Sequence, residues 1–165
     1  MKFFTRQWHS GDLSDREVEK LSNAYTAHLE LLIPNLPVAL RQLAQGVNLH
    51  DGLVRNITLD RGEDTMIIAL RCGDLQSGYF DVDLVYGNVD LSKSELRDLE
   101  TIAREANAEV LYDEVDAAAS GRWIHRILFW PYREVCIEFG DFGLHLEPRN
   151  NREFTRGPNV YVERP

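Results

Sequence analysis

His50 and Asp51 put an imidazole beside a carboxylate where helical periodicity gives way to strand alternation. Such a pair can supply a general base or a metal ligand when further groups come from elsewhere in the chain. Because neighbouring strand residues point to opposite faces of a sheet, adjacency in sequence is weak evidence for a catalytic pair. We therefore favour a structural interpretation, in which Asp51 and Gly52 turn into the first strand and His50 closes the helix-to-sheet junction by hydrogen bonding.

A second candidate pair is Asp113 with His125, on two strand-like segments separated by a short loop. If these strands pair about residues 118 and 119, Asp113 lies directly opposite His125. Together with Asp81 and Asp83 on another strand, the pair would form a cluster able to hold a divalent cation. The simpler interpretation, which we prefer, is a solvated face with one cross-strand ion pair, usually worth under about 1 kcal/mol.

No complete catalytic set accompanies these residues. The chain has no phosphate-binding loop, dinucleotide fingerprint or zinc-ligand spacing, and its serines lack the glycine-flanked setting of a nucleophile elbow. Cys72 and Cys136 lie in apolar strand-like runs and are expected to be buried free thiols. We expect neither cofactor nor metal, and the sequence argues against an enzyme without deciding the question.

The elements that must position these side chains follow from capping residues and hydrophobic periodicity. Ser14 and Glu17 form a capping-box pattern that predicts a helix over 15–32, and Ser92 with Glu95 predicts another that stops near Asn107. A short helix should run from Pro37 to Gly46. Alternating segments predict strands over 53–59, 65–72, 78–86, 109–115, 122–130 and 134–139.

Short connections between successive strands favour antiparallel pairing. The predicted fold class is α+β: an N-terminal helical hairpin plus an antiparallel sheet of six or more strands with one inserted helix. Gly140 and Asp141 would either close a further hairpin or form a bulge in one long strand. We predict a single domain over 1–147 and an irregular basic tail over 148–165. Residues 160–162 are apolar enough to dock as an edge strand at the surface, either on this chain or on a second copy.

The charge of the chain is strongly negative. The formal net charge is −9, and since the last 18 residues carry four arginines against two glutamates (+2), residues 1–147 carry −11. An acidic body disfavours nucleic acid and favours a basic protein partner, for which Asp81, Asp83 and Glu114 are the predicted binding surface. The N-terminus lacks the apolar core of a signal peptide and no run is long enough to span a membrane, so we expect a soluble, cytoplasmic protein.

Four segments together resemble an uncharacterised bacterial domain-of-unknown-function family: residues 1–5, 49–51, 111–115 and 124–129. The resemblance spans nearly the whole chain and implies a bacterial source, but it brings no activity with it. The N-terminal helices followed by an antiparallel sheet also resemble small immunity proteins that neutralise secreted toxins. This resemblance concerns the fold and does not by itself indicate the function.

Three functional hypotheses remain at this point. The leading one is a small non-catalytic protein-binding module, immunity-like in form, whose acidic surface engages a basic partner such as a toxin. The alternative is a metal-binding domain or metal-assisted hydrolase that uses His50, Asp51, Asp113 and His125. A third, structural hypothesis is a homodimer formed through an edge strand or through the arginine-bearing tail.

Overall fold

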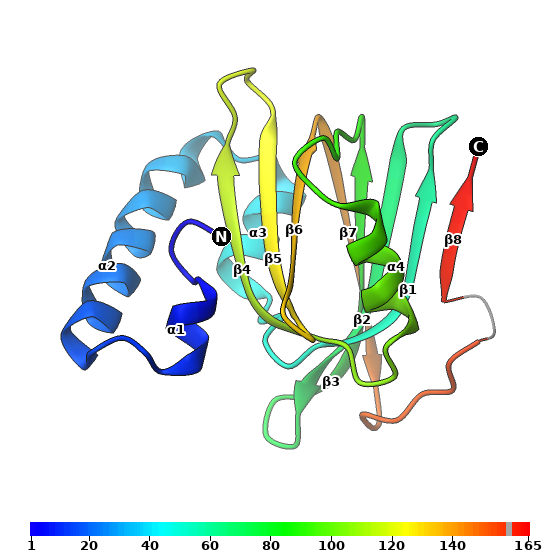
Figure 1. Cartoon of the computed structure of the whole chain (residues 1–165), viewed down its shortest axis with the longest axis horizontal. Helices are drawn as coiled ribbons and strands as arrows, with labels where there is room; N and C mark the ends of the chain where they lie inside the picture. The colour runs from blue at the N-terminus through cyan, green and yellow to red at the C-terminus, as the bar shows by residue number, and fades with distance from the viewer. Residues whose placement is uncertain (158–159) are drawn as a thin grey trace.

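The computed structural model describes residues 1–157 and 160–165 (Figure 1). Its helices are α1 (Arg6–Ser10), α2 (Asp15–Leu32), the 3-10 turn η1 (Ile33–Asn35), α3 (Val38–Gly46) and α4 (Leu96–Arg104). Its strands are β1 (Leu53–Asp60), β2 (Thr65–Asp74), β3 (Gly78–Gly87), β4 (Glu109–Ala117), β5 (Trp123–Trp130), β6 (Arg133–Phe139), β7 (Asp141–Arg149) and β8 (Tyr161–Arg164). The fold is α+β with N-terminal helices and an antiparallel sheet, as predicted.

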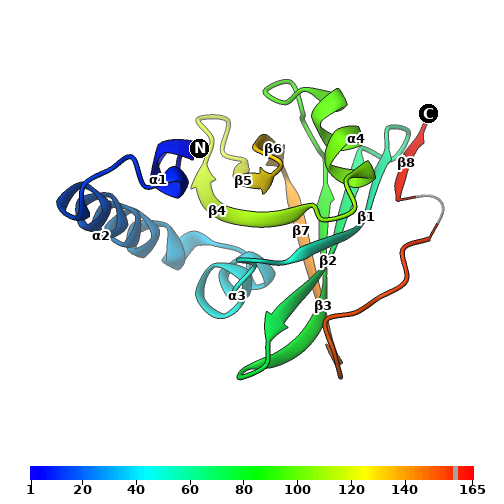
Figure 2. The same cartoon turned by 60° about the horizontal axis from the view of Figure 1, so that its bottom comes forward.

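The sheet divides into two wings that are joined at a narrow point. The strand order is β6-β5-β4-β1-β2-β3-β7, with antiparallel neighbours throughout. β1 and β4 pair only at Leu53 and Glu109, so β4, β5 and β6 form one wing and β1, β2, β3 and β7 the other. Further along β1, the short strand β8 takes the vacant side in parallel pairing. The strands of the two wings diverge from the junction in Figure 2.

The hydrophobic core lies between the inner faces of the two wings. Tyr86 on β3 packs its ring 5.2 Å from Phe139 on β6 and 5.3 Å from Phe142 on β7. Alternation along β3 buries Val82, Leu84 and Tyr86 on one face. The apolar patterns that predict the strands therefore converge on one core, closed by α4, which packs on β1, β6 and β8.

Helices α2 and α3 begin and end where the sequence predicts, whereas the short helix α1 is not among the predicted elements. A capping box between Ser14 and Glu17 starts α2, and the chain leaves the α-helix before Pro34, which lacks a backbone N–H. Pro37 caps α3, which ends at Gly46. None of the residues of α2 is fully buried, and Figure 2 shows this helix on the outside of the β4 wing.

The predicted start of the inserted helix at Ser92 is wrong. α4 begins only at Leu96, after Glu95, and ends at Arg104. The Ser92 amide donates to the Asp90 carboxylate (2.8 Å), which forms a turn. The Ser94 hydroxyl donates to the carbonyl of Cys136 (2.8 Å) and accepts its N–H (2.7 Å). These bonds hold the segment from Ser92 to Ser94 in a non-helical conformation against β6, so the helix begins only after this segment.

The C-terminal part of the chain completes the sheet in a way that neither predicted alternative describes. β7 forms neither a hairpin with β6 nor a continuation of it; after Gly140 the chain crosses to the other wing and pairs with β3 from Asp141 to Arg149. Residues 161–164 dock as a strand on β1 of the same chain, and residues 158–159 of the predicted tail lie outside the described residues.

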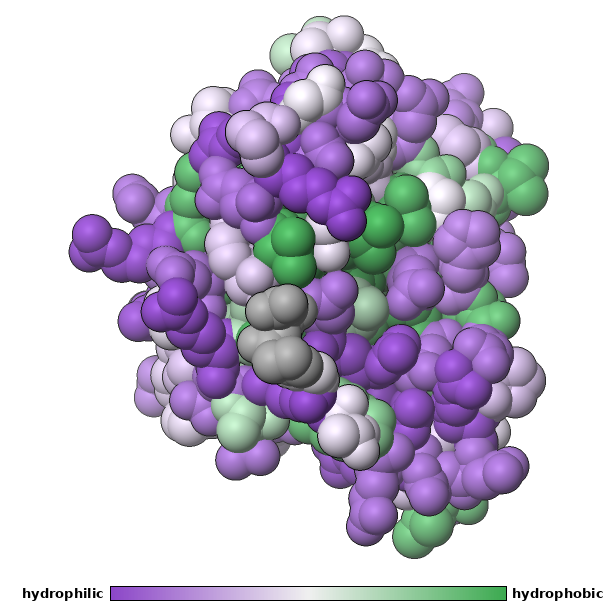
Figure 3. All heavy atoms as spheres, turned by 90° about the vertical axis from the view of Figure 1, so that its right-hand side faces the viewer, coloured by the Kyte–Doolittle hydropathy of each residue, from purple (hydrophilic) through white to green (hydrophobic). Residues whose placement is uncertain are grey.

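The face that carries β8 is mainly hydrophilic, with hydrophobic residues in small separate patches (Figure 3). Patches of this size are ordinary on a protein surface and need no partner to cover them. Within the described residues, no helix combines the length and apolar character that crossing a membrane requires.

Candidate ligand-binding site

A cavity of about 370 Å³ opens where β4 separates from β1. α3 and the loop after it close one side, and the N-terminal segment with α2 closes the other. Its lining combines aromatic rings, aliphatic side chains, one imidazole and one carboxylate: Phe4, Tyr25, Leu43, Ala44, Val47, Asn48, His50, Leu111, Tyr112 and Asp113. Two of the four sequence-predicted site residues, His50 and Asp113, therefore line one cavity.

The edge of β4 is open along this cavity. Backbone groups of an antiparallel strand alternate between the paired side and the free side. The N–H of Val115 points to the free side, where it donates to the Tyr25 hydroxyl (3.0 Å), and the carbonyl of Leu111 faces His50 there. Asp113, two residues from each, presents its own N–H and C=O to the same side.

Asp113 is fixed from behind by His125. Nε2 of His125 lies 3.0 Å from Oδ2 of Asp113, and the imidazole is fully buried while the carboxylate is 25 % exposed. The predicted register is wrong by two residues: His125 pairs with Val115, and Asp113 pairs with Ile127. The turn is centred nearer Ser120 than predicted. Because a two-residue slip keeps a side chain on the same face, the contact survives as a diagonal one.

Tyr86 completes a chain of three polar groups that enters the core from the other wing. Its hydroxyl lies 2.7 Å from Nδ1 of His125. Complete burial, followed by the charge of Asp113, raises the pKa of Tyr86 well above its ordinary value, so the phenol keeps its proton. With that proton donated to Nδ1, Nε2 is the ring nitrogen of His125 that donates to Asp113. The Asp113 carboxylate is thus the final acceptor in this series of hydrogen bonds.

His50 and Asp51 form the junction between helices and sheet. Nδ1 of His50 lies 2.6 Å from the Leu111 carbonyl, and since a carbonyl oxygen can only accept, Nδ1 is the donor. The ring stacks on Tyr112 with centroids 5.3 Å apart. Asp51 has a left-handed backbone (φ 59°), and its carboxylate is 59 % exposed, 3.5 Å from Nε2 of His50. Asp51 is outside the cavity lining, although it lies beside a residue that lines it.

The aromatic wall of the cavity depends on the N-terminal segment. The carboxylate of Glu114 accepts the N–H groups of Lys2 (2.8 Å), Phe3 (2.6 Å) and Phe4 (2.7 Å). The ring of Phe4 then packs 4.9 Å from Tyr25 and 5.6 Å from Tyr112. Burial, with added repulsion from nearby carboxylates, raises the pKa of Tyr25, which keeps this wall uncharged.

The three carboxylates of the predicted binding surface lie in different environments. Glu114 is buried at 1 % exposure, and Asp81 is buried at 5 %. Asp81 accepts from Arg71 (2.6 Å) and Arg149 (2.6 Å), so both carboxylates are occupied within the fold. Asp83, 45 % exposed on its side chain, remains accessible to a partner.

The polar side chains that line the site are those of Tyr25, Asn48, His50, Tyr112 and Asp113. Among the described residues, no group of three or more His, Cys, Asp or Glu side chains is arranged to hold a metal ion. Over the same part of the chain, the lining contains no Ser, Thr, Cys or Lys. What it offers is an acceptor at the base of an aromatic-walled cavity.

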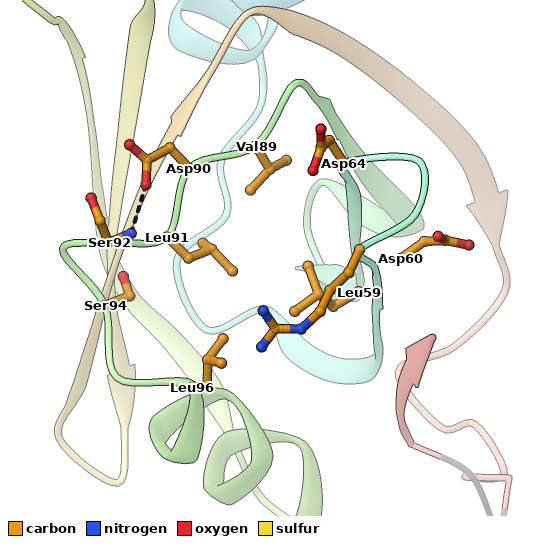
Figure 4. Close-up of a pocket in the computed structure, with 10 residues that line it drawn as sticks. Leu59, Asp60, Asp64, Val89, Asp90, Leu91, Ser92, Ser94 and Leu96 are labelled. Carbon is orange, nitrogen blue, oxygen red and sulfur yellow. Dashed lines mark hydrogen bonds between the residues drawn. The ribbon is translucent and has the colours of Figure 1, made fainter. Parts of the chain in front are cut away.

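Another cavity, of about 510 Å³, lies between the β1–β2 turn and the segment that leads into α4 (Figure 4). Leu59, Val89, Leu91 and Leu96 project into it. Much of its polar rim serves the local fold: Asp90 accepts the Ser92 amide, and Ser94 bonds to the backbone of Cys136. Asp60 likewise accepts the Glu63 amide (3.1 Å). The cavity at Asp113 differs in having a buried residue that orients its charged group.

Sequence reasoning missed Tyr86, Tyr112, Tyr25 and Phe4. One signal was available for Tyr86: it alternates inward with Val82 and Leu84, and a buried phenol requires a hydrogen-bond partner. The other three come together through the fold of the N-terminal segment on β4, which no local pattern specifies.

The fold and site define a small α+β protein with a ligand-sized cavity at the open edge of an antiparallel sheet. Residues 1–139 match the family described as "Protein of unknown function (DUF4085)", and the chain belongs to that family. No curated protein and no solved structure matches the chain. The matched residues include α1 to α4 and β1 to β6, and hence every residue that lines the cavity.

Proposed function

We propose that the protein is a non-catalytic binding module that engages a basic protein partner at the cavity beside β4. The observation that carries the proposal is the Asp113 carboxylate, held by the buried His125 at the base of an aromatic-walled cavity. A charge that is oriented in advance costs little ordering on binding, which favours a partner of opposite charge.

The charge of the whole protein supports the same partner. A net charge of −9 attracts a basic protein over long range and accelerates encounter. The exposed Asp51 adds a negative charge beside His50, which lines the cavity. A basic toxin neutralised by this protein is the form of partnership that fits an immunity-like role.

Two aspartates provide a matched pair of variants that test where a basic partner binds. Asp51 and Asp64 are exposed, lie in turns and have left-handed backbones (φ 59° and 48°), a conformation that asparagine also tolerates. Asp64 lines the other cavity, the one in Figure 4. Asp51→Asn and Asp64→Asn therefore remove one charge each, at two different places, with little strain.

The probe is a fluorescent peptide of nine arginines, titrated with each protein at several salt concentrations. Wild type should bind, more weakly as salt increases. Asp51→Asn should reduce affinity by about two- to fivefold, as expected for one partly screened charge, and Asp64→Asn should have less effect. Equal effects of the two substitutions, or no binding at low salt, would contradict the proposal.

A further inference from the structure

We propose that the cavity beside β4 is a receptor for a guanidinium group, the head of an arginine side chain, with Asp113 as its anion and His125 and Tyr86 as positioning residues. This inference rests on the proposed function and names the chemical group that the site recognises. It goes further than overall charge, because it assigns the recognition to one cavity.

The acceptors of the cavity suit a planar cation with several N–H donors. Oδ2 of Asp113 is engaged by His125, while Oδ1 has no hydrogen-bond partner among the described residues. The carbonyl of Asp113 faces the same open edge of β4, by the alternation described above. A guanidinium carries five N–H donors in one plane and can reach two such acceptors at once.

The walls of the cavity suit the faces of that cation. The aromatic rings of Phe4, Tyr25 and Tyr112 line the cavity, and His50, stacked on Tyr112, lines it too. A guanidinium is weakly hydrated and stacks on aromatic rings, whereas an ammonium group is a strongly hydrated point charge. The volume of about 370 Å³ is at the small end for ligand pockets and fits a side-chain-sized ligand.

The buried pair behind Asp113 orients the charge of the site. Because Tyr86 keeps its proton and donates to Nδ1, Nε2 of His125 is the nitrogen that donates to Oδ2 of Asp113. That bond fixes one oxygen of the carboxylate and leaves Oδ1 for the ligand. Tyr86 and His125 therefore position the negative charge that the ligand meets.

The first measurement compares arginine amide with citrulline amide, its neutral isostere, by calorimetry and by amide shifts of the protein. A tripeptide with a central arginine, blocked at both ends, forms a second arm that distinguishes a protein-borne guanidinium from a free one. We expect arginine ligands to bind at least tenfold more tightly than citrulline ligands. If the tripeptide binds and arginine amide does not, the site recognises a guanidinium only as part of a peptide. Equal binding of arginine and citrulline ligands overturns the inference.

Variants test the assigned residues. Asp113→Asn keeps an oxygen for His125 but removes the charge, so it should weaken arginine binding at least tenfold. Tyr86→Phe removes the hydrogen bond that orients His125, so it should lower arginine affinity by about threefold and leave citrulline affinity unchanged. An unchanged affinity in Asp113→Asn, or an unchanged ratio of arginine to citrulline affinity in Tyr86→Phe, would refute the assignment. If the nine-arginine peptide still binds Asp113→Asn fully and remains sensitive to Asp51→Asn, the assignment of a guanidinium to Asp113 fails, while engagement of a basic partner beside His50 and Asp51 stands.

Discussion

His125 and Asp113 are not cross-strand partners in the β4–β5 ladder, yet Nε2 of one lies 3.0 Å from Oδ2 of the other. The contact is diagonal, between residues two positions out of register on the same face. It links the hydrophobic core, where His125 bonds to Tyr86, to the cavity, where Asp113 is partly exposed. A buried polar chain of this kind contributes to stability and orients a charged group at the surface.

The first prediction concerns the contribution of the Tyr86–His125–Asp113 hydrogen bonds to the stability of the fold. His125→Ala leaves a cavity in the core and removes the partner of both Tyr86 and Asp113, so it should lower the free energy of unfolding by about 2–4 kcal/mol in urea titrations. His145→Ala is the control, because His145 is exposed on β7 and its removal should change stability by less than about 0.5 kcal/mol. Similar values for the two variants would show that His125 is not an integral part of the core.

The second prediction concerns the N-terminal segment. Glu114→Gln replaces two carboxylate oxygens by one oxygen and one NH₂ group, which cannot accept the amides of Lys2, Phe3 and Phe4 together. Amide hydrogen exchange at residues 2–4 should accelerate by at least tenfold, and the Phe4 wall of the cavity should loosen. Glu19→Gln on the exposed side of α2 should leave this exchange unchanged. Unaltered protection in Glu114→Gln would mean that other contacts hold the segment.

The third prediction follows from the pKa of Asp81. Burial alone would raise that pKa, but hydrogen bonds from Arg71 and Arg149 and the charge of Arg55 outweigh it and lower the pKa below 3.8. A carboxyl group with a lowered folded-state pKa stabilises the fold above its unfolded-state pKa, and this contribution is lost as pH falls through the folded-state value. Stability should therefore fall as pH decreases below about 3.8.

Asp81→Asn provides the test for this acid dependence. At pH 7 it leaves the buried Arg71 without its ion-pair partner and should cost roughly 2–5 kcal/mol in urea unfolding. Below pH 3.8 the difference from wild type should narrow, because the wild-type carboxyl is then protonated in the unfolded state and increasingly in the folded state. A constant difference from pH 7 to pH 2.5 would exclude Asp81 as a source of acid sensitivity.

The fourth prediction concerns the C-terminal segment before β8. The Arg156 guanidinium donates to the carbonyls of Glu105 (2.6 Å) and Val54 (2.5 Å), which ties this segment to the start of β1. Arg156→Ala should increase the rate of proteolysis between residues 150 and 157. Arg156→Lys should restore little of the protection, because one ammonium group does not reproduce the planar fork. Arg16→Ala on exposed α2 controls for charge, and equal rates in all variants would contradict this role.

Local patterns in the sequence predicted most of the fold. The capping box at Ser14 and the alternation in β3 are local signals, and the structure confirms them. In β1, a bulge between Val54 and Asn56 interrupts the predicted alternation. The start of α4 was mispredicted because Ser94 bonds to β6, a contact 42 residues away in sequence. The local sequence does not predict which strand β7 pairs with, because its pairing with β3 depends on the closure of the whole sheet.

The candidate site was predictable only in part for the same reason. Alternation in β4 and β5 placed Asp113 and His125 on one face, and that inference holds in spite of the wrong register. The meeting of His50 with Asp113 at one cavity depends on the separation of β4 from β1 and on the seating of the N-terminal segment by Glu114. These are long-range arrangements that neither periodicity nor spacing encodes.

The most direct test of the central claim is an amide-shift titration of the ¹⁵N-labelled protein with the unlabelled nine-arginine peptide. Binding at the cavity beside β4 predicts that the largest saturable shifts occur at His50, Tyr112 and Asp113, and that Asp113→Asn abolishes them. Shifts centred on Asp64 and Asp90, at the cavity of Figure 4, or shifts spread over the acidic surface without saturation, would contradict the account.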